Sequence, residues 1–299
     1  MAVRYTPNLV NHGFDRSASP AFQMVPANGT RVLTVHGSHG LEPTVIEVDP
    51  LHPVLTIAKL GSGSHVRLAL TAGWTAGVAF VAWARPGATT SGLGNDFLLE
   101  VSVKVNKPVH AHFHYVDDGK RQVTRRNPDD LEKLIADANA ILTAQANVTI
   151  HQMGGSGKLE VTQDLGRVVR RVSDKLAGPP HHVDRAEDEW DDLRKLGNAT
   201  ADLNVFFVRE FEADQHPNRD DAEAGTIRAH KMIILEDSTS APAGTVLAHE
   251  VGHALGIKGH PPGTNPRFLM ATGRRGTGRF LPKTQINKIN KSGTYGTGS

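Results

Sequence analysis

The sequence predicts an α+β protein, in which an N-terminal all-β sandwich is followed by a second domain that mixes strands and helices. Short runs of β-branched residues separated by turn residues fill the first 106 positions, without a helical periodicity. Strand and helix patterns then alternate, and a histidine-rich helical motif lies near residue 250. With 299 residues, the chain is long enough for two domains that each bury a core.

Residues 1–106 are expected to form a β-sandwich of immunoglobulin-like type. This accessory domain would serve for binding, for spacing or as a cover. In the last run, residues 97–105, apolar side chains from Leu99 to Val105 alternate with polar ones. This period of two predicts a half-buried strand. The predicted strands are Arg31–His36, Thr44–Val48, Val54–Ala58, His65–Thr71, Val78–Trp83 and Phe97–Val105.

Residues 107–290 are expected to form the second domain, and residues 291–299 a flexible tail. Asn127 is expected to cap a helix that has Pro128 at its first position and runs to about Ala144. The other predicted elements are strands at Val109–Val116, Val148–Gln152, Leu203–Arg209 and Lys231–Leu235, a helix at Gly244–Leu255, and a helix or long excursion at Thr162–Leu176.

Composition excludes several kinds of site. The chain has no cysteine, which excludes disulfide scaffolds, cysteine-ligated zinc, iron–sulfur clusters and thiol catalysis. The net charge of +2 predicts no particular partner. Aromatic residues do not interleave with basic ones, so no nucleic acid partner is expected.

The N-terminus begins MAVRYTPNLVNHGFDRSASP and lacks both the apolar core and the cleavage site of a Sec signal peptide. No stretch has the length of a transmembrane helix, so membrane insertion is not expected. A secreted protein that uses a non-Sec route is therefore predicted, with a cytoplasmic location as the alternative.

The motif that carries chemistry is His249-Glu250-Val251-Gly252-His253. On a helix, His249 and His253 project from one face, because they are four residues apart. Two neutral imidazoles at this spacing can bind one Zn²⁺. Glu250 can reach a water at that metal and act as the general base.

The third ligand follows by elimination. After Glu250 the sequence contains neither Asp nor Glu, so a downstream carboxylate ligand is impossible. His260 is the only imidazole beyond the motif. Gly256 can take the left-handed conformation that ends a helix, which lets the chain turn back and bring His260 to the metal. Three protein ligands and an open position are typical of a catalytic zinc site.

The segment HEVGHALGIKGH, followed by Phe268-Leu269-Met270, resembles the metzincin clan of zinc metalloproteases. The resemblance covers about residues 107–290, and it implies a mixed sheet, an active-site helix and a Met-turn at Met270 beneath the metal. It also implies a C-terminal helix at Phe280–Asn290 and a substrate-binding edge strand at Gly225–His230. The sequence departs from the clan pattern at Gly259, since the histidine comes one residue later. A bulge with positive φ is expected at Gly259.

The predicted function is that of a monomeric zinc endopeptidase that cleaves a protein or peptide substrate, with Glu250 as general base. One alternative is a binding or adhesion module, in which the sandwich acts and the protease half is degenerate. Another is a toxin effector, delivered by a secretion apparatus, that uses the same protease chemistry. The sequence leaves open the substrate, the cleavage specificity, the latency mechanism and the role of the sandwich.

Several histidines and acidic residues lie outside this motif. His110, His112 and His114 share one face of a strand, which predicts a solvated row more readily than a zinc site. His114 and His230 are the substitute ligands if His260 does not reach the metal. His181-His182 are expected to lie in a surface loop, and the carboxylates within Asp184–Asp192 are expected to form a solvated helix face.

Overall fold

A computed structural model describes residues 3–63, 65–89, 93–170, 189–212, 223–228, 231–239, 242–260, 267–271 and 278–291. Strands and helices both occur in this part of the chain, as expected for the α+β class. The chain divides into two compact units, and each combines separate segments. The first contains Met1–Lys107, Ile141–Thr149 and Arg279–Lys291, and the second contains Pro108–Ala140, Ile150–Gly278 and Ser292–Ser299.

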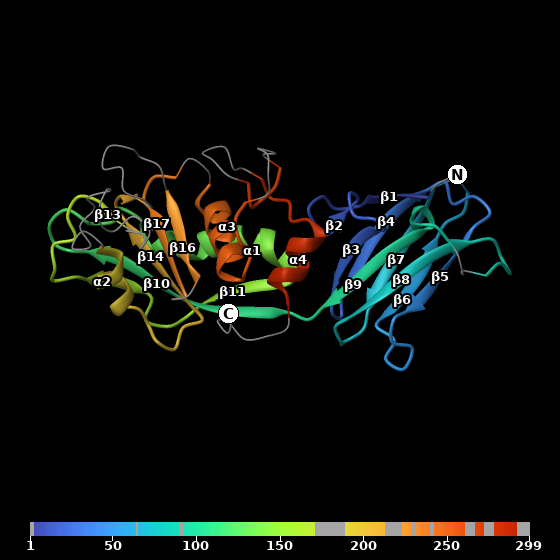
Figure 1. Ribbon diagram of the computed structural model, residues 1–299, viewed down its shortest axis with the longest axis horizontal. Coiled ribbons are helices and arrows are strands. Elements are labelled where there is room, and N and C mark those ends of the chain that lie inside the picture. Colours follow the sequence, from blue (N-terminus) through green and yellow to red (C-terminus); the bar gives the residue numbers. More distant parts are fainter. Residues whose placement is uncertain are drawn as a thin grey trace, which may run out of the picture. The chain divides into compact units, whose positions relative to one another are not determined.

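The first unit contains two sheets (Figure 1). Side chains from both sheets form one hydrophobic core. One sheet has the order β1 (Arg4–Pro7), β4 (Thr30–His36), β7 (His65–Ala72) and β6 (Leu55–Leu60), with all neighbours antiparallel. The other has the order β2 (Phe14–Asp15), β3 (Ala21–Pro26), β9 (Leu98–Lys104), β8 (Gly77–Ala84) and β5 (Glu42–Glu47). In this second sheet only the β3–β9 pair is parallel. A 3-10 turn, η1 (Asn95–Phe97), precedes β9.

The prediction that β9 is half-buried is wrong. Leu99, Val101 and Val103 do enter the sandwich core, but Glu100 and Ser102 on the other face are buried as well. Strand β9 lies between β3 and β8, and the ammonium of Lys283 pairs with the carboxylate of Glu100. Both faces of the strand are therefore covered, and Glu100 is paired with a residue of the first unit.

The later segments of the first unit attach to the sandwich through specific hydrogen bonds. Helix α4 (Lys283–Ile289) begins where the backbone N–H of Lys283 donates to Asp15, at 2.9 Å. Just before it, the N–H of Leu281 donates to the side chain of Gln145, at 2.8 Å. The amide of Asn147 donates to the carbonyl of Lys104, at 2.7 Å. The first unit is thus assembled from three parts of the chain.

The second unit is built on a six-stranded sheet with the order β11-β10-β14-β17-β16, in which β12 also pairs with β10. Strands β10, β14 and β17 run parallel, and β16 is antiparallel to β17 at one edge. These strands are β10 (Lys107–Asp117), β11 (Val148–Gln152), β12 (Gly157–Glu160), β14 (Leu203–Val208), β16 (Ala224–Ile227) and β17 (Met232–Glu236). Every residue of β14 is buried, as its apolar sequence predicts for a central parallel strand.

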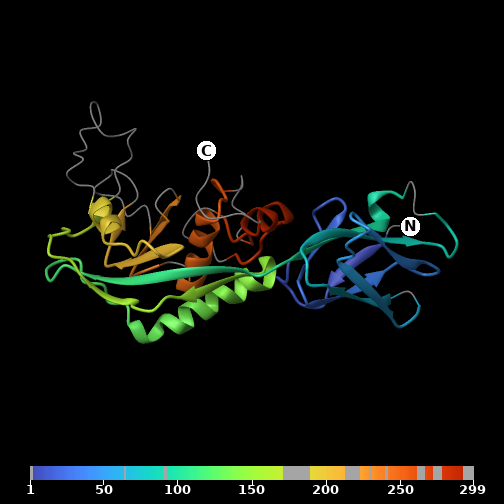
Figure 2. The same ribbon diagram turned by 90° about the horizontal axis from the view of Figure 1, so that it is seen from below.

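Helices α1 (Leu131–Ala146) and α3 (Ala243–Ala254) are the longest in the described residues. The side chain of Asn127 accepts from the N–H of Asp129, and Pro128 starts a 3-10 turn, η2 (Pro128–Asp130), that leads into α1. Figure 2 shows α1 running along β10, and α3 packs against β16 and β17. The cap predicted at Asn127 therefore holds.

Smaller elements complete the second unit and correct one prediction. A two-stranded sheet pairs β13 (Val169–Arg170) with β15 (Phe211–Glu212), and α2 (Glu189–Lys195) is a short helix. No helix occurs within 162–170, where a helix or excursion was predicted, because this segment supplies β13. Residues 171–176 lie outside the described part. None of the described helices is long and apolar enough to cross a membrane.

Candidate metal centre

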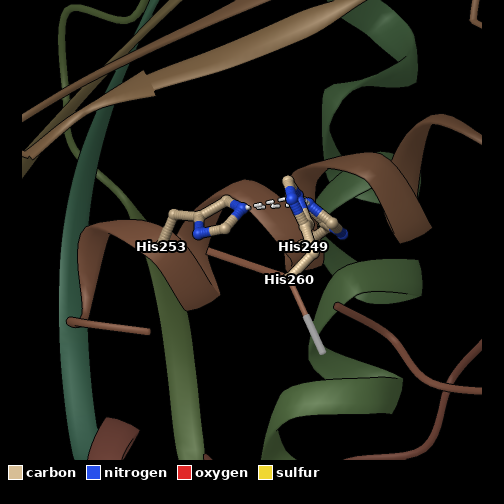
Figure 3. A group of neighbouring side chains, drawn as sticks. All are labelled: His249, His253 and His260. Atoms are coloured by element: carbon tan, nitrogen blue, oxygen red, sulfur yellow. Dashed lines mark hydrogen bonds between the residues drawn. The ribbon is translucent and has the colours of Figure 1, made fainter. Parts of the chain in front are cut away.

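The imidazoles of His249, His253 and His260 converge on one point (Figure 3). The Nε2 atoms of His249 and His253 are 3.1 Å apart. The Nε2 atom of His260 lies 3.2 Å from each of them. Among the described residues, this is the one group of three or more potential ligands that could hold a metal ion.

The nitrogen positions fit a zinc ion. Three nitrogens at ~2.0–2.1 Å from a tetrahedral Zn²⁺ lie about 3.3 Å from one another. The observed separations of 3.1 to 3.2 Å match this spacing closely. The donor set also matches, since all three ligand atoms are imidazole nitrogens, which are common ligands of zinc.

Helix α3 supplies two of the three imidazoles. Its first and middle turns bury Leu247, Ala248 and Val251, so the face with His249 and His253 is left partly open. Both rings are oriented through their Nδ1 atoms. His249 Nδ1 donates to the carbonyl of Leu269 at 2.6 Å, and His253 Nδ1 donates to that of Ile257 at 2.8 Å. A carbonyl only accepts, so each bond leaves the Nε2 lone pair facing the metal position.

The end of α3 is a Schellman turn, and it also orients His253. The N–H of Gly256 donates to His253 O at 2.9 Å, and the N–H of Ile257 donates to Gly252 O at 3.0 Å. Gly256 has φ of +112°, the left-handed region expected from its place after the helix. This turn places the carbonyl of Ile257 where it accepts from His253.

Gly259 makes the second turn that the displaced histidine requires. Its φ is +65°, the positive value expected from the extra residue before His260. The chain reverses there, and the exposed side chain of His260 returns to the two histidines of α3. The structure therefore absorbs the one-residue shift in the backbone of Gly259.

Glu250 is buried beside the three histidines, with 6% of its surface exposed. Its carboxylate Oε2 accepts from the hydroxyl of Thr226 on β16, at 2.5 Å. Burial raises the pKa of Glu250 above its ordinary value, while the bond from Thr226 and the nearby His253 act in the opposite direction. A carboxyl group with a raised pKa is suited to take and return a proton near neutral pH.

Burial lowers the pKa of two of the histidines. It brings the pKa of His249 down to about 4, against the opposing effect of the bond to Leu269. It also lowers the pKa of His260, with a further contribution from His249. These imidazoles are therefore neutral at physiological pH, which is the form that binds a metal.

Met270 packs under α3 and is fully buried. A Cβ built on Gly252 would lie 2.7 Å from its Sδ, so an alanine at this position would oblige the end of the Met270 side chain to shift. The neighbouring carbonyl of Leu269 is the one that orients His249. The segment around Met270 thus supports the metal centre by packing and by one hydrogen bond.

Substituting Met270 by Leu is expected to lower the free energy of unfolding by less than about 1.5 kcal/mol, because the two side chains have similar volumes. Zinc binding should persist. Gly252→Ala is the contrasting variant, and its added methyl group should cost about 1–3 kcal/mol by overpacking. Urea unfolding and zinc analysis would measure both effects. Complete loss of metal from Met270→Leu would show that Met270 does more than pack.

The prediction that the histidines on β10 form a solvated strand face is wrong. His112 and His114 are buried, and His114 Nε2 lies 2.9 Å from Oδ1 of Asn204. Burial lowers the pKa of His114 to about 4. His110 is more exposed and contacts Asp202, with 3.1 Å between Nδ1 and Oδ2. None of these residues belongs to the cluster of His249, His253 and His260, so His114 does not serve as its substitute ligand here.

Other predicted features fall partly outside the described residues. These are His181-His182, His230 and the first part of Asp184–Asp192. In the described remainder, Asp191 and Asp192 lie on α2 and pair with Lys195 of the same helix. The edge segment predicted at Gly225–His230 is β16, the terminal strand of the sheet, as far as the chain is described.

Sequence reasoning did not find Thr226 or the carbonyls of Ile257 and Leu269. A threonine in a short strand and two carbonyls carry no spacing pattern that relates them to a histidine motif. The alternation of β16 could have indicated that Thr226 faces α3, but only once the partner of that face was known.

Comparisons with known proteins give limited similarity. The structure resembles a zinc-dependent peptidase from Methanocorpusculum labreanum, with 11% identity and a TM-score of 0.34 over 60% of this chain and 100% of that one. It also resembles a chimeric titin Z1Z2 carrying a peptide from decorin, with 15% identity and a TM-score of 0.19 over 36% of this chain and 100% of that one. No protein-family model and no curated protein sequence matches the chain.

Proposed function

We propose that this protein is a zinc-dependent endopeptidase of the metzincin type. The observation that carries the proposal is the convergence of three Nε2 atoms within 3.2 Å of one another beside the buried carboxylate of Glu250. The motif supplies the first two histidines, and the turn at Gly259 supplies the third. Met270, which packs against Gly252 of α3, would be the Met-turn methionine of the clan.

His249, His253 and His260 would hold the zinc ion. When bound by three imidazoles, zinc supplies Lewis acidity to a water molecule and to the carbonyl of the peptide bond that is cut. The carbonyls of Leu269 and Ile257 keep two of the rings in the required tautomer and orientation.

Glu250 would move the proton. Its carboxylate accepts a proton from the water that attacks the carbonyl carbon, and then donates it to the nitrogen of the leaving amine. The buried setting of Glu250 raises the pKa of this carboxyl, so it can hold the proton between the two transfers.

The substrate would be a protein or peptide in extended form. Among the described strands β16 pairs only with β17, so its other edge can add a peptide strand through backbone hydrogen bonds. The same strand carries Thr226, which contacts Glu250. A peptide added along β16 would therefore run beside the general base.

Metal removal tests the proposal. The purified protein loaded with zinc is expected to cleave an unstructured protein such as casein. Treatment with 1,10-phenanthroline should reduce the rate by about 100-fold or more, since the metal would supply the main stabilisation of charge. Zinc added after removal of the chelator should restore it.

The isomer 1,7-phenanthroline, which does not chelate, controls for nonspecific inhibition. A zinc-loaded protein without hydrolytic activity on a panel of unfolded proteins, or a rate that the chelator leaves unchanged, would contradict the proposed function. The binding-module alternative predicts this outcome.

A further inference from the structure

Thr226 links the edge strand to the buried carboxylate of Glu250. In β16, Gly225 lies close to Phe211, and Ile227 joins the core on that same face of the sheet. Because side chains alternate along a strand, Thr226 points to the opposite face, where α3 packs. Its hydroxyl lies 2.5 Å from Oε2 and 3.0 Å from the backbone carbonyl oxygen of Glu250.

The hydroxyl has one hydrogen to donate, so these two acceptors compete for it. The shorter distance and the negative charge favour the carboxylate, since hydrogen bonds to ionised acceptors are shorter and stronger. Among the described residues, Thr226 is the one donor that bonds to Oε2 of Glu250. A buried carboxylate without it would be free to rotate about its last torsion, which has a broad energy profile.

We propose that Thr226 is a positioning residue, which fixes the carboxylate of Glu250 by holding Oε2 and leaving Oε1 to meet the attacking water. This inference rests on the proposed function. The hydroxyl acts through Glu250 and does not itself touch the reacting atoms. Through this hydrogen bond, the position of the general base depends on β16, the strand along which the substrate would lie.

The test compares Thr226→Val and Thr226→Ser. Valine has the same shape and β-branching but no hydroxyl, so it removes the bond and preserves the strand. Loss of a hydrogen bond to a charged group is expected to lower kcat by about 10–100-fold. KM should stay within about 2-fold, because the backbone edge that binds substrate is unchanged. Serine restores the hydroxyl, and kcat should return to within about 3-fold of the wild-type value.

Two further measurements separate positioning from structure. Zinc affinity, measured by competition with a chelating dye, should be the same in both variants and the wild type. The midpoint of thermal unfolding should fall by only several degrees in Thr226→Val, because one buried hydrogen bond is lost, and the variant should stay folded at the assay temperature. Thr56→Val, which removes an exposed hydroxyl from strand β6 of the first unit, is the matched control and should leave all values unchanged.

The outcomes are distinguishable. If the wild-type protein does not hydrolyse peptides, the proposed function itself fails. If the wild type is active, an unchanged kcat in Thr226→Val overturns the role of Thr226. So does a serine variant as impaired as the valine variant, or a loss of zinc or of stability in Thr226→Val that accounts for its lower activity.

Discussion

Substituting Glu250 by Gln is expected to reduce peptide hydrolysis by about 100-fold or more, the usual contribution of general acid–base catalysis. The amide keeps the shape of the side chain, and its carbonyl oxygen can still accept from Thr226. It cannot accept the proton of the attacking water. Glu250 is not one of the three proposed zinc ligands, so zinc content should stay near one ion per chain.

Steady-state hydrolysis, zinc analysis and circular dichroism on the same preparation would measure the three properties together. Glu212→Gln is a matched control, because Glu212 is a buried glutamate of the same unit that lies on β15. A turnover of Glu250→Gln within a few-fold of the wild type would exclude Glu250 as the general base.

Removing the imidazole of His260 is expected to abolish hydrolysis and to weaken zinc binding by about 100-fold or more, since two histidines are an incomplete set for zinc. His260 is the ligand that stands outside α3 and depends on the turn at Gly259. His260→Ala leaves only the Nε2 pair of His249 and His253, 3.1 Å apart. His260→Asp should retain part of the affinity, because a carboxylate can also bind zinc.

Zinc affinity of the purified variants, measured by dye competition, would check this expectation. His52→Ala controls for the loss of a histidine, because His52 is an exposed residue of the first unit. A zinc-loaded structure in which the His260 ring faces solvent, with His230 or another side chain in its place, would contradict the assignment.

Much of the arrangement of the candidate metal centre could be predicted because local rules determine it. The four-residue spacing of His249 and His253 on a helix, the glycine after the helix end and the extra residue at Gly259 each have a local geometric consequence. The strands with β-branched runs were also predicted close to their observed bounds. The N-terminal strands β1, β2 and β3 were not, because they are short or lack alternation.

What remained unpredicted depends on the neighbours of each residue in space. Glu100 reads as the outward residue of a half-buried strand, yet Lys283, distant in sequence, covers it. His112 and His114 read as a polar face, yet they are buried, and His114 contacts Asn204. Thr226 acquires a role only because α3 brings Glu250 against β16. A single sequence holds no periodic trace of such tertiary contacts.

The first unit draws on residues near the start, the middle and the end of the described chain. During synthesis, the contacts of Lys283 with Asp15 and Glu100 can form only after Lys283 has been made and has left the ribosome. The sandwich therefore cannot reach its final set of contacts until almost the whole chain is available, including the histidine motif of α3. Long-range closures of this kind slow folding. The residues of the candidate metal centre, from His249 to His260, also come late in the sequence, shortly before Lys283. The first unit and the candidate metal centre therefore complete their contacts at nearly the same stage of synthesis.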